Sequence, residues 1–160
     1  MRLRAFGRLA ALFLTVPAVL GAEAMAADLS GLRAWVGKYP YDQIGGRQFF
    51  THAGMPAAMR RALGNKDDRR VAKVRGPEVP VVAVDGWVVA HRCQAHDCGN
   101  KNVSVLVHVA SGRVLVCWLN APHRSAARWY EAGKPTKRDP GQGCPSEAGE
   151  VRAAFWRLGY

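Results

Sequence analysis

The chain has 160 residues, of which 23 are Lys or Arg and 12 are Asp or Glu, so its formal net charge is +11 at pH 7. A hydrophobic content of 49% is typical of a globular protein rather than of a disordered one. The length is sufficient for one domain and excludes a large multidomain enzyme, a repeat array and a polytopic membrane protein. The charge suggests an anionic partner, although charge bears on association and solubility and not on the fold.

Residues 1–26 have the pattern of a secretory signal peptide. Arg2, Arg4 and Arg8 form a basic beginning, residues 9–20 form an apolar run, and two small-x-small cleavage sequences end at positions 24 and 26. The apolar run is too short for the roughly 20 residues that span a bilayer, so a membrane anchor is not expected. A buried N-terminal helix is the alternative interpretation. No cysteine follows the cleavage region directly, which argues against a lipid anchor.

Cleavage after Ala26 would leave a single periplasmic domain, residues 27–160. Removal of three Arg and one Glu leaves 20 basic against 11 acidic residues, a net charge of +9. Both a monomer and a homodimer are compatible with this chain. An exported protein seldom meets nucleic acid, so nucleic acid is not expected as a partner.

The four cysteines would meet an oxidising environment after export, which favours disulfides. Four cysteines allow three pairings. We favour Cys93–Cys98 with Cys117–Cys144, because Cys93 and Cys98 are close enough to close a tight loop between two strands. From loop length alone, the first disulfide would stabilise the fold by about 2 kcal/mol and the second by roughly 3.5 kcal/mol.

The centre of the chain has the pattern of antiparallel strands joined by short turns. The turn Asp85-Gly86 separates two apolar runs, and a period-two alternation begins at Val103. The predicted strands are residues 81–84, 87–90, 103–109 and 113–120, with a short fifth strand at 129–130.

Two helices are expected outside this group of strands. The first covers residues 55–63, with Pro56 in its first turn and Gly64 beyond its end. The second covers residues 146–158 and is capped by Ser146. Residues 65–75 and 134–144 are polar and are predicted to be loops. Helices outside a cluster of strands indicate an α+β fold with a central antiparallel sheet of about five strands.

Residues 91–99 contain the residues best suited to chemistry. His91, Cys93, His96 and Cys98 are ligand types that zinc prefers, but their spacing matches none of the usual zinc signatures. Redox catalysis would require Cys-x-x-Cys, whereas four residues separate these cysteines.

A third interpretation is a disulfide-closed recognition loop. Closing the loop removes most of its freedom before binding, which lowers the ordering cost of a protein contact. His96 would then lie at the tip beside Asp97, able to donate and to accept hydrogen bonds. The alternative is a structural disulfide with an exposed histidine.

A family resemblance is carried by the segment Cys93-Gln94-Ala95-His96-Asp97-Cys98-Gly99. The segment follows a strand that contains Trp87 and precedes an alternating strand. It resembles the Cys-x-x-His-x-Cys loop of the Ivy family, which are periplasmic inhibitors of vertebrate lysozyme. The resemblance is clear over residues 81–120.

The resemblance implies a central antiparallel sheet with helices packed on one side and a rigid protruding loop. It also implies that His96 enters the lysozyme cleft and bonds the catalytic carboxylates, that Asp97 supports the loop, and that Cys93 and Cys98 close it. Such a protein would be an inhibitor and not an enzyme, with no catalytic residue, cofactor or metal of its own.

Two features depart from the family pattern. Members often carry Lys-Pro where this chain has Gln94-Ala95, and loss of the proline loosens the loop because proline fixes φ. The pair Cys117 and Cys144 lies outside the loop motif and suggests a second disulfide. Arg92 and Lys101 flank the loop, so its surroundings are not expected to be acidic.

A function of a different class is a basic module that binds an anionic glycan or lipopolysaccharide of the cell envelope. It would use the basic residues within 66–75 together with Lys134, Lys137 and Arg138. Its binding would depend steeply on salt.

Overall fold

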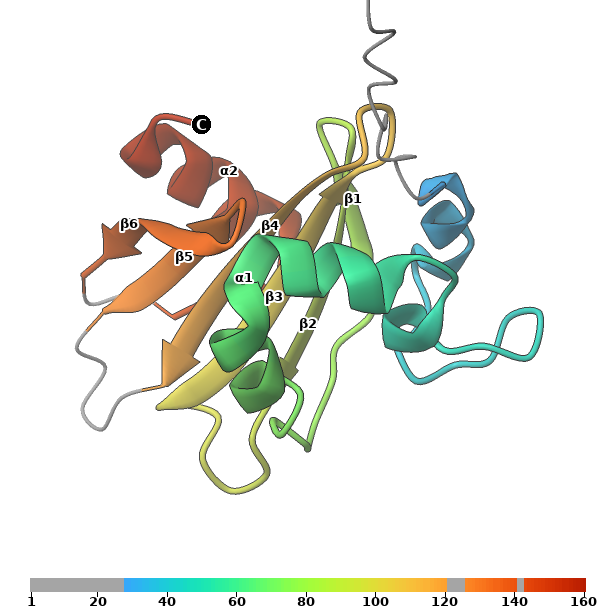
Figure 1. Cartoon of the computed structure of the whole chain (residues 1–160), viewed down its shortest axis with the longest axis horizontal. Helices are drawn as coiled ribbons and strands as arrows, with labels where there is room; N and C mark the ends of the chain where they lie inside the picture. The colour runs from blue at the N-terminus through green and yellow to red at the C-terminus, as the bar shows by residue number, and fades with distance from the viewer. Residues whose placement is uncertain (1–27, 121–125, 141–142) are drawn as a thin grey trace, which may run out of the picture.

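The computed structural model describes residues 28–120, 126–140 and 143–160. The predicted signal peptide lies outside the described residues. Six strands form one antiparallel sheet in which each strand pairs with its neighbours in sequence (Figure 1). The strands are β1 (Val82–Val84), β2 (Trp87–Cys93), β3 (Lys101–His108), β4 (Arg113–Asn120), β5 (Ala127–Glu131) and β6 (Lys134–Asp139). The α+β class and the antiparallel sheet are therefore confirmed.

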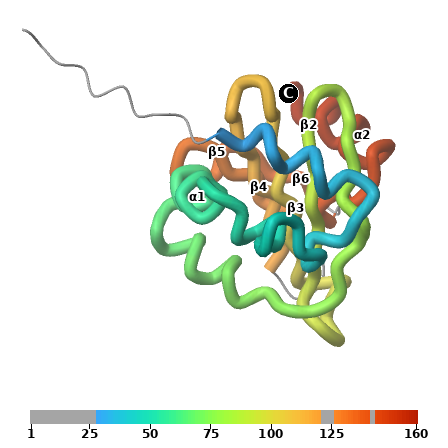
Figure 2. Tube along the Cα trace, turned by 90° about the vertical axis from the view of Figure 1, so that its right-hand side faces the viewer, coloured from blue at the N-terminus to red at the C-terminus, as the bar shows by residue number. Residues whose placement is uncertain are grey.

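The helices lie on both faces of the sheet. The 3-10 helices η1 (Ser30–Trp35) and η2 (Phe49–Thr51) share one face with α1 (Met55–Val71), and α2 (Ala148–Leu158) covers the other face (Figure 2). No helix among the described ranges is both long and apolar enough to cross a membrane.

The sheet carries a hydrophobic core on each face, which differs from the expected arrangement of helices on one side only. In β4, Val114, Val116 and Trp118 pack toward α1, and the alternate residues Leu115, Cys117 and Leu119 pack toward α2. Successive side chains of a strand point to opposite faces, so a strand that is apolar throughout needs cover on both. The physical reason for two helical layers is thus present in the residues of β4.

The first helix is longer than expected because it continues beyond a kink. Gly64 has φ 76° and ψ 157°, which interrupts the helix at the place where the sequence predicts its end. A Cβ at Gly64 would lie 2.9 Å from the carbonyl oxygen of Gly133, so the close approach favours glycine. The prediction that residues 65–75 form a loop is wrong as far as Val71, which is fully buried in the same core and holds the second helical segment against the sheet.

The sixth strand replaces part of a predicted loop. Ala132 and Gly133 both have positive φ and form the tight turn between β5 and β6. Pro135 lies in an edge strand, the place in a sheet where proline is best tolerated. Asp139 at the end of β6 is buried and pairs with Arg157 of α2, at 2.7 Å between Oδ2 and Nη2.

Candidate functional site

The structure contains two disulfides among the described residues. Cys93–Cys98 closes the connection from β2 to β3 into a loop, and Cys117–Cys144 joins β4 to the segment before α2. This is the pairing that the sequence favoured. A zinc site at these cysteines is inconsistent with the structure, since both sulfurs are bonded to one another. Within the described residues, no group of three His, Cys, Asp or Glu side chains is placed to hold a metal.

In the Cys93–Cys98 loop, residues 93–98, His96 is exposed, and the connection from β2 to β3 that contains this loop lies at the lower edge of Figure 1. His96 has φ 62°, in the left-handed region that residues other than glycine adopt mainly in turns. Backbone hydrogen bonds fix this turn: the N–H of Gln94 donates to the carbonyl of Lys101 at 2.8 Å, and the N–H of Asp97 donates to that of Gln94 at 3.0 Å. The imidazole therefore stands on a backbone whose shape is set before any partner binds.

The carboxylate of Asp97 is bound within the loop's own base. Lys101 Nζ lies 3.0 Å from one oxygen, and Asn100 Nδ2 donates to the other at 2.9 Å. These hydrogen bonds, that of Lys101 first, lower the pKa of Asp97. The carboxylate of Asp97 therefore bonds two side chains that follow the loop, and a supporting role for Asp97 stays a prediction.

One side of the loop is attached to residues 75–77, which form a strap along it. The N–H of Cys93 donates to the carbonyl of Pro77 at 3.0 Å, and the N–H of Ala95 donates to that of Arg75 at 2.9 Å. Between them, Gly76 passes so close that a Cβ would lie 2.3 Å from the nitrogen of Ala95. Sequence reasoning did not identify this strap; the Gly76-Pro77 dipeptide, a typical sign of a fixed turn, was the available signal.

The other side of the loop is held by Asn102, which sequence reasoning also missed. Its Nδ2 donates to the carbonyl of Cys98 at 2.7 Å, and its Oδ1 accepts from the N–H of Cys144 at 2.9 Å. The side chain is buried, so these bonds satisfy both ends of the amide in a place that water does not reach. Asn102 therefore links the two disulfides through a single side chain.

His91 is a structural residue on the α2 face. Its Nδ1 lies 2.9 Å from Ser104 Oγ, which in turn donates to the carbonyl of Pro145 at 2.5 Å. Burial lowers the pKa of His91 to about 4, because a charged imidazole would lose its hydration there. His91 is therefore neutral at pH 7 and stands apart from the tip of the loop.

The sequence profile described as inhibitor of vertebrate lysozyme (Ivy) matches residues 54–155. The chain belongs to the Ivy family. The matched range contains the Cys93–Cys98 loop, its attachments and both disulfides, and the suspected resemblance is confirmed. Membership implies a lysozyme inhibitor, in a family of secreted or periplasmic inhibitors rather than of enzymes. Neither a curated protein nor a solved structure matches the chain.

The two cations that flank this Ivy loop in sequence are hidden or paired, whereas Arg75, which contacts the loop through its backbone, is exposed. Arg92 is only 7% exposed and lies against the ring of Phe50, with 4.3 Å between its Cζ and the ring centroid. Lys101 is paired with Asp97. Neither flanking cation therefore stands free beside His96, which reduces the local repulsion that a basic partner would meet.

The attachment at Ala95 leads to a prediction about the Lys-Pro pair common in Ivy loops. Ala95→Pro removes the N–H that donates to Arg75, and its ring Cδ would point into the 2.9 Å gap between these atoms. We expect the variant to lose at least about 1 kcal/mol of unfolding free energy, the usual net value of such a bond, and to inhibit more weakly. Urea unfolding compared with Ala95→Ser, which keeps the N–H, measures the effect. Equal stability of the two variants would show that the strap does not hold the loop.

Proposed function

We propose that the chain is a periplasmic inhibitor that occludes the lysozyme active-site cleft with the Cys93–Cys98 loop and its histidine, His96. In this proposal residues 1–26 direct export and are removed, and residues 27–160 act as one Ivy-like domain. The single observation that carries the proposal is the exposed His96 at the tip of a loop closed by a disulfide and attached on both sides.

The chemistry of the target suits an imidazole. A lysozyme holds one carboxylic acid and one carboxylate on either side of the bond that it cleaves. A neutral imidazole has one donor and one acceptor nitrogen, so it can bond both groups at once while its ring excludes the sugar. No bond is made or broken, and inhibition follows from occupancy alone.

The rigidity of the loop favours tight binding. A free segment of this length would lose backbone freedom on entering a cleft, at roughly 1–2 kcal/mol for each residue fixed. Here the disulfide, the strap at residues 75–77 and the amide of Asn102 have already fixed the backbone. Most of the ordering therefore takes place during folding, and little of it opposes association.

The test is a cell-wall lysis assay with a panel of animal and bacterial lysozymes. We expect His96→Ala to require at least tenfold more inhibitor for half-inhibition, about 1.4 kcal/mol of lost binding, with an unchanged circular dichroism spectrum. His108→Ala is the matched control, because His108 lies at the opposite end of β3 from the loop. Undiminished inhibition by His96→Ala would contradict the mechanism.

The alternative, a basic module for an anionic glycan or lipopolysaccharide, has less support from the arrangement of its residues. Lys137 pairs in register with Trp129 of the α2-side core, and its Nζ donates to the carbonyl of Leu158. Arg138, the next residue of β6, points to the opposite face. The proposed basic residues are thus divided between two faces. Binding that falls steeply with salt and is indifferent to His96→Ala would favour this alternative.

A further inference from the structure

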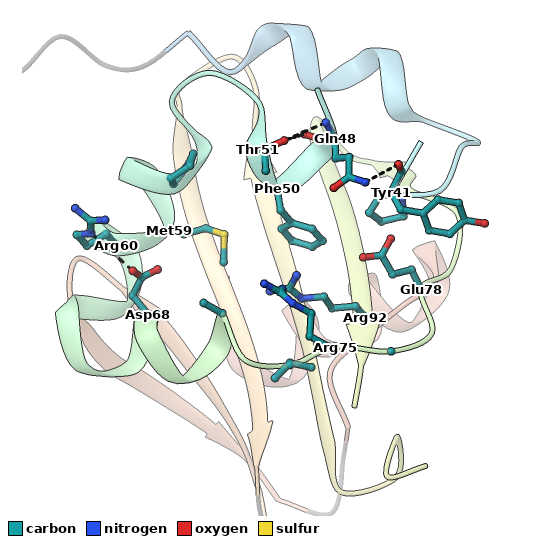
Figure 3. A pocket seen from close by; sticks show the side chains of 15 residues that line it. Tyr41, Gln48, Phe50, Thr51, Met59, Arg60, Asp68, Arg75, Glu78 and Arg92 are labelled. Carbon is teal, nitrogen blue, oxygen red and sulfur yellow. Dashed lines mark hydrogen bonds and ion pairs between the residues drawn. The ribbon is translucent and has the colours of Figure 1, made fainter. Parts of the chain in front are cut away.

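A cavity of about 500 Å³ lies on the α1 face, next to the segment that holds the loop (Figure 3). Its walls come from α1, η2 and residues 40–41 and 72–78, and Arg92 enters it from β2. Phe50 and Met59 supply apolar surface, and the polar side chains of Arg75, Glu78 and Arg92 also line it (Figure 3). Few polar groups converging on an apolar hollow of this size are typical of small-molecule sites.

Arg92 brings a buried positive charge to the wall of this cavity. The residue is 7% exposed, its Nη2 donates to the carbonyl of Val71 at 3.2 Å, and its Nε has no partner among the described residues. Burial lowers its pKa to about 10, so the guanidinium remains charged at neutral pH. The buried guanidinium forms no ion pair among the described residues, and a buried charge without a counter-charge is costly, which indicates that an anionic group belongs beside it.

The other charged groups of the cavity define what that ligand carries. Arg60 and Asp68 pair with each other at 3.7 Å. Arg75 and Arg92 form no ion pair within the described ranges, so two unpaired guanidinium groups and the single carboxyl of Glu78 line the cavity. This balance favours a group with one negative charge over a neutral ligand.

Glu78 adds a second requirement. Its Oε2 is buried and unpartnered among the described residues, and burial raises the pKa of the carboxyl. A hydroxyl can donate to the carboxylate or accept from the protonated acid, so it satisfies Glu78 in either form.

We propose that this cavity binds a small sugar acid, with its carboxylate on Arg92 and Arg75 and a hydroxyl on Glu78. The cavity volume suits one or two sugar rings, and the apolar wall suits the C–H face of a ring. The site is separate from the tip of the Cys93–Cys98 loop, so the inference goes beyond lysozyme inhibition and does not depend on it.

The test is a titration of the folded protein with D-glucuronate, followed by amide chemical shifts in two-dimensional NMR. We expect saturable shifts around Arg92 and Glu78. In Arg75→Gln and in Glu78→Gln the dissociation constant should be at least fivefold larger. Arg61→Gln is the matched control, because Arg61 is exposed on α1 and does not line the cavity. These variants change the edge of the cavity and leave the buried Arg92 in place.

Two further probes, glucose and acetate, test the carboxylate and the hydroxyl of the ligand separately. Glucose lacks the carboxylate and is expected to give no saturable shift, whereas acetate lacks the hydroxyl and is expected to bind at least fivefold more weakly than glucuronate. Acetate binding as tightly as glucuronate would overturn the assignment of a sugar acid. Absence of saturation by glucuronate, or equal binding by Arg75→Gln and Arg61→Gln, would overturn the site itself.

Discussion

Replacing Cys117 and Cys144 together by alanine is expected to lower the free energy of unfolding by about 3.5 kcal/mol, the largest effect of any change considered for this chain. The disulfide spans a sequence separation of 27, so its loss returns considerable freedom to the unfolded chain. Both residues are buried in the α2-side core, and alanine keeps them apolar. The loss therefore reflects the cross-link and not a buried polar group.

The matched comparison is the double variant Cys93→Ala/Cys98→Ala, whose disulfide has a sequence separation of only 5. The same relation gives that variant a loss of about 2 kcal/mol, so urea unfolding should rank the two pairs clearly. For inhibition we expect the opposite order, with the larger loss in Cys93→Ala/Cys98→Ala, because only the shorter disulfide closes the loop directly. A larger stability loss from the shorter disulfide would contradict the loop-length account.

The Cys117–Cys144 variant should also weaken inhibition modestly through Asn102. The segment at Cys144 supplies the N–H that holds Asn102 Oδ1, and Asn102 Nδ2 holds the carbonyl of Cys98. When the cross-link is removed, this support for the loop becomes less fixed. Inhibition assayed well below the unfolding midpoint would reveal the effect without contribution from unfolded protein.

Lowering the pH from 7 to 4 is expected to remove up to about 3 kcal/mol of stability through His91 alone. Its pKa is about 4 in the folded protein, against 6.5 for an ordinary histidine. Between these values the unfolded chain binds a proton that the folded chain does not, so protonation favours unfolding. The contribution is complete above pH 6.5, falls as the pH drops toward 4, and changes no further below that value.

The measurement is the free energy of unfolding at pH 7 and at pH 4 for the native chain and for His91→Gln. Carboxyl groups remote from His91 affect both proteins alike, whereas Glu150 interacts with His91, so the difference between their pH dependences reports His91 together with its interaction with Glu150. We expect the variant to lose about 3 kcal/mol less on acidification. Identical pH profiles would mean that His91 does not remain neutral within the fold.

The sequence predicted the parts of the fold that depend on local pattern. The alternation that begins at Val103 and the turn Asp85-Gly86 placed the central strands, since period two and turn chemistry act within a few residues. Gly64 marked the break in α1 for the same reason. The strand β6 was missed because its residues are polar, and only pairing with β5 makes them a strand.

The candidate site divides in a similar way. The motif from Cys93 to Gly99 predicted the loop and its disulfide, because both lie within seven positions. The partners that hold the loop come from elsewhere in the chain. Arg75 and Pro77 precede the loop by 16 residues or more, and Cys144 lies 42 residues after its hydrogen-bond partner Asn102. No local pattern relates such positions.

The sequence by itself thus determined a basic chain with one disulfide-closed loop and a central antiparallel sheet. Only the tertiary structure decided that Arg92, which precedes the loop, is hidden, since its burial under Phe50 depends on where η2 packs. The same holds for the cavity that Arg92 enters, whose walls are far apart in sequence. Charge is a property of composition, whereas its exposure depends on packing, and packing is what a partner meets.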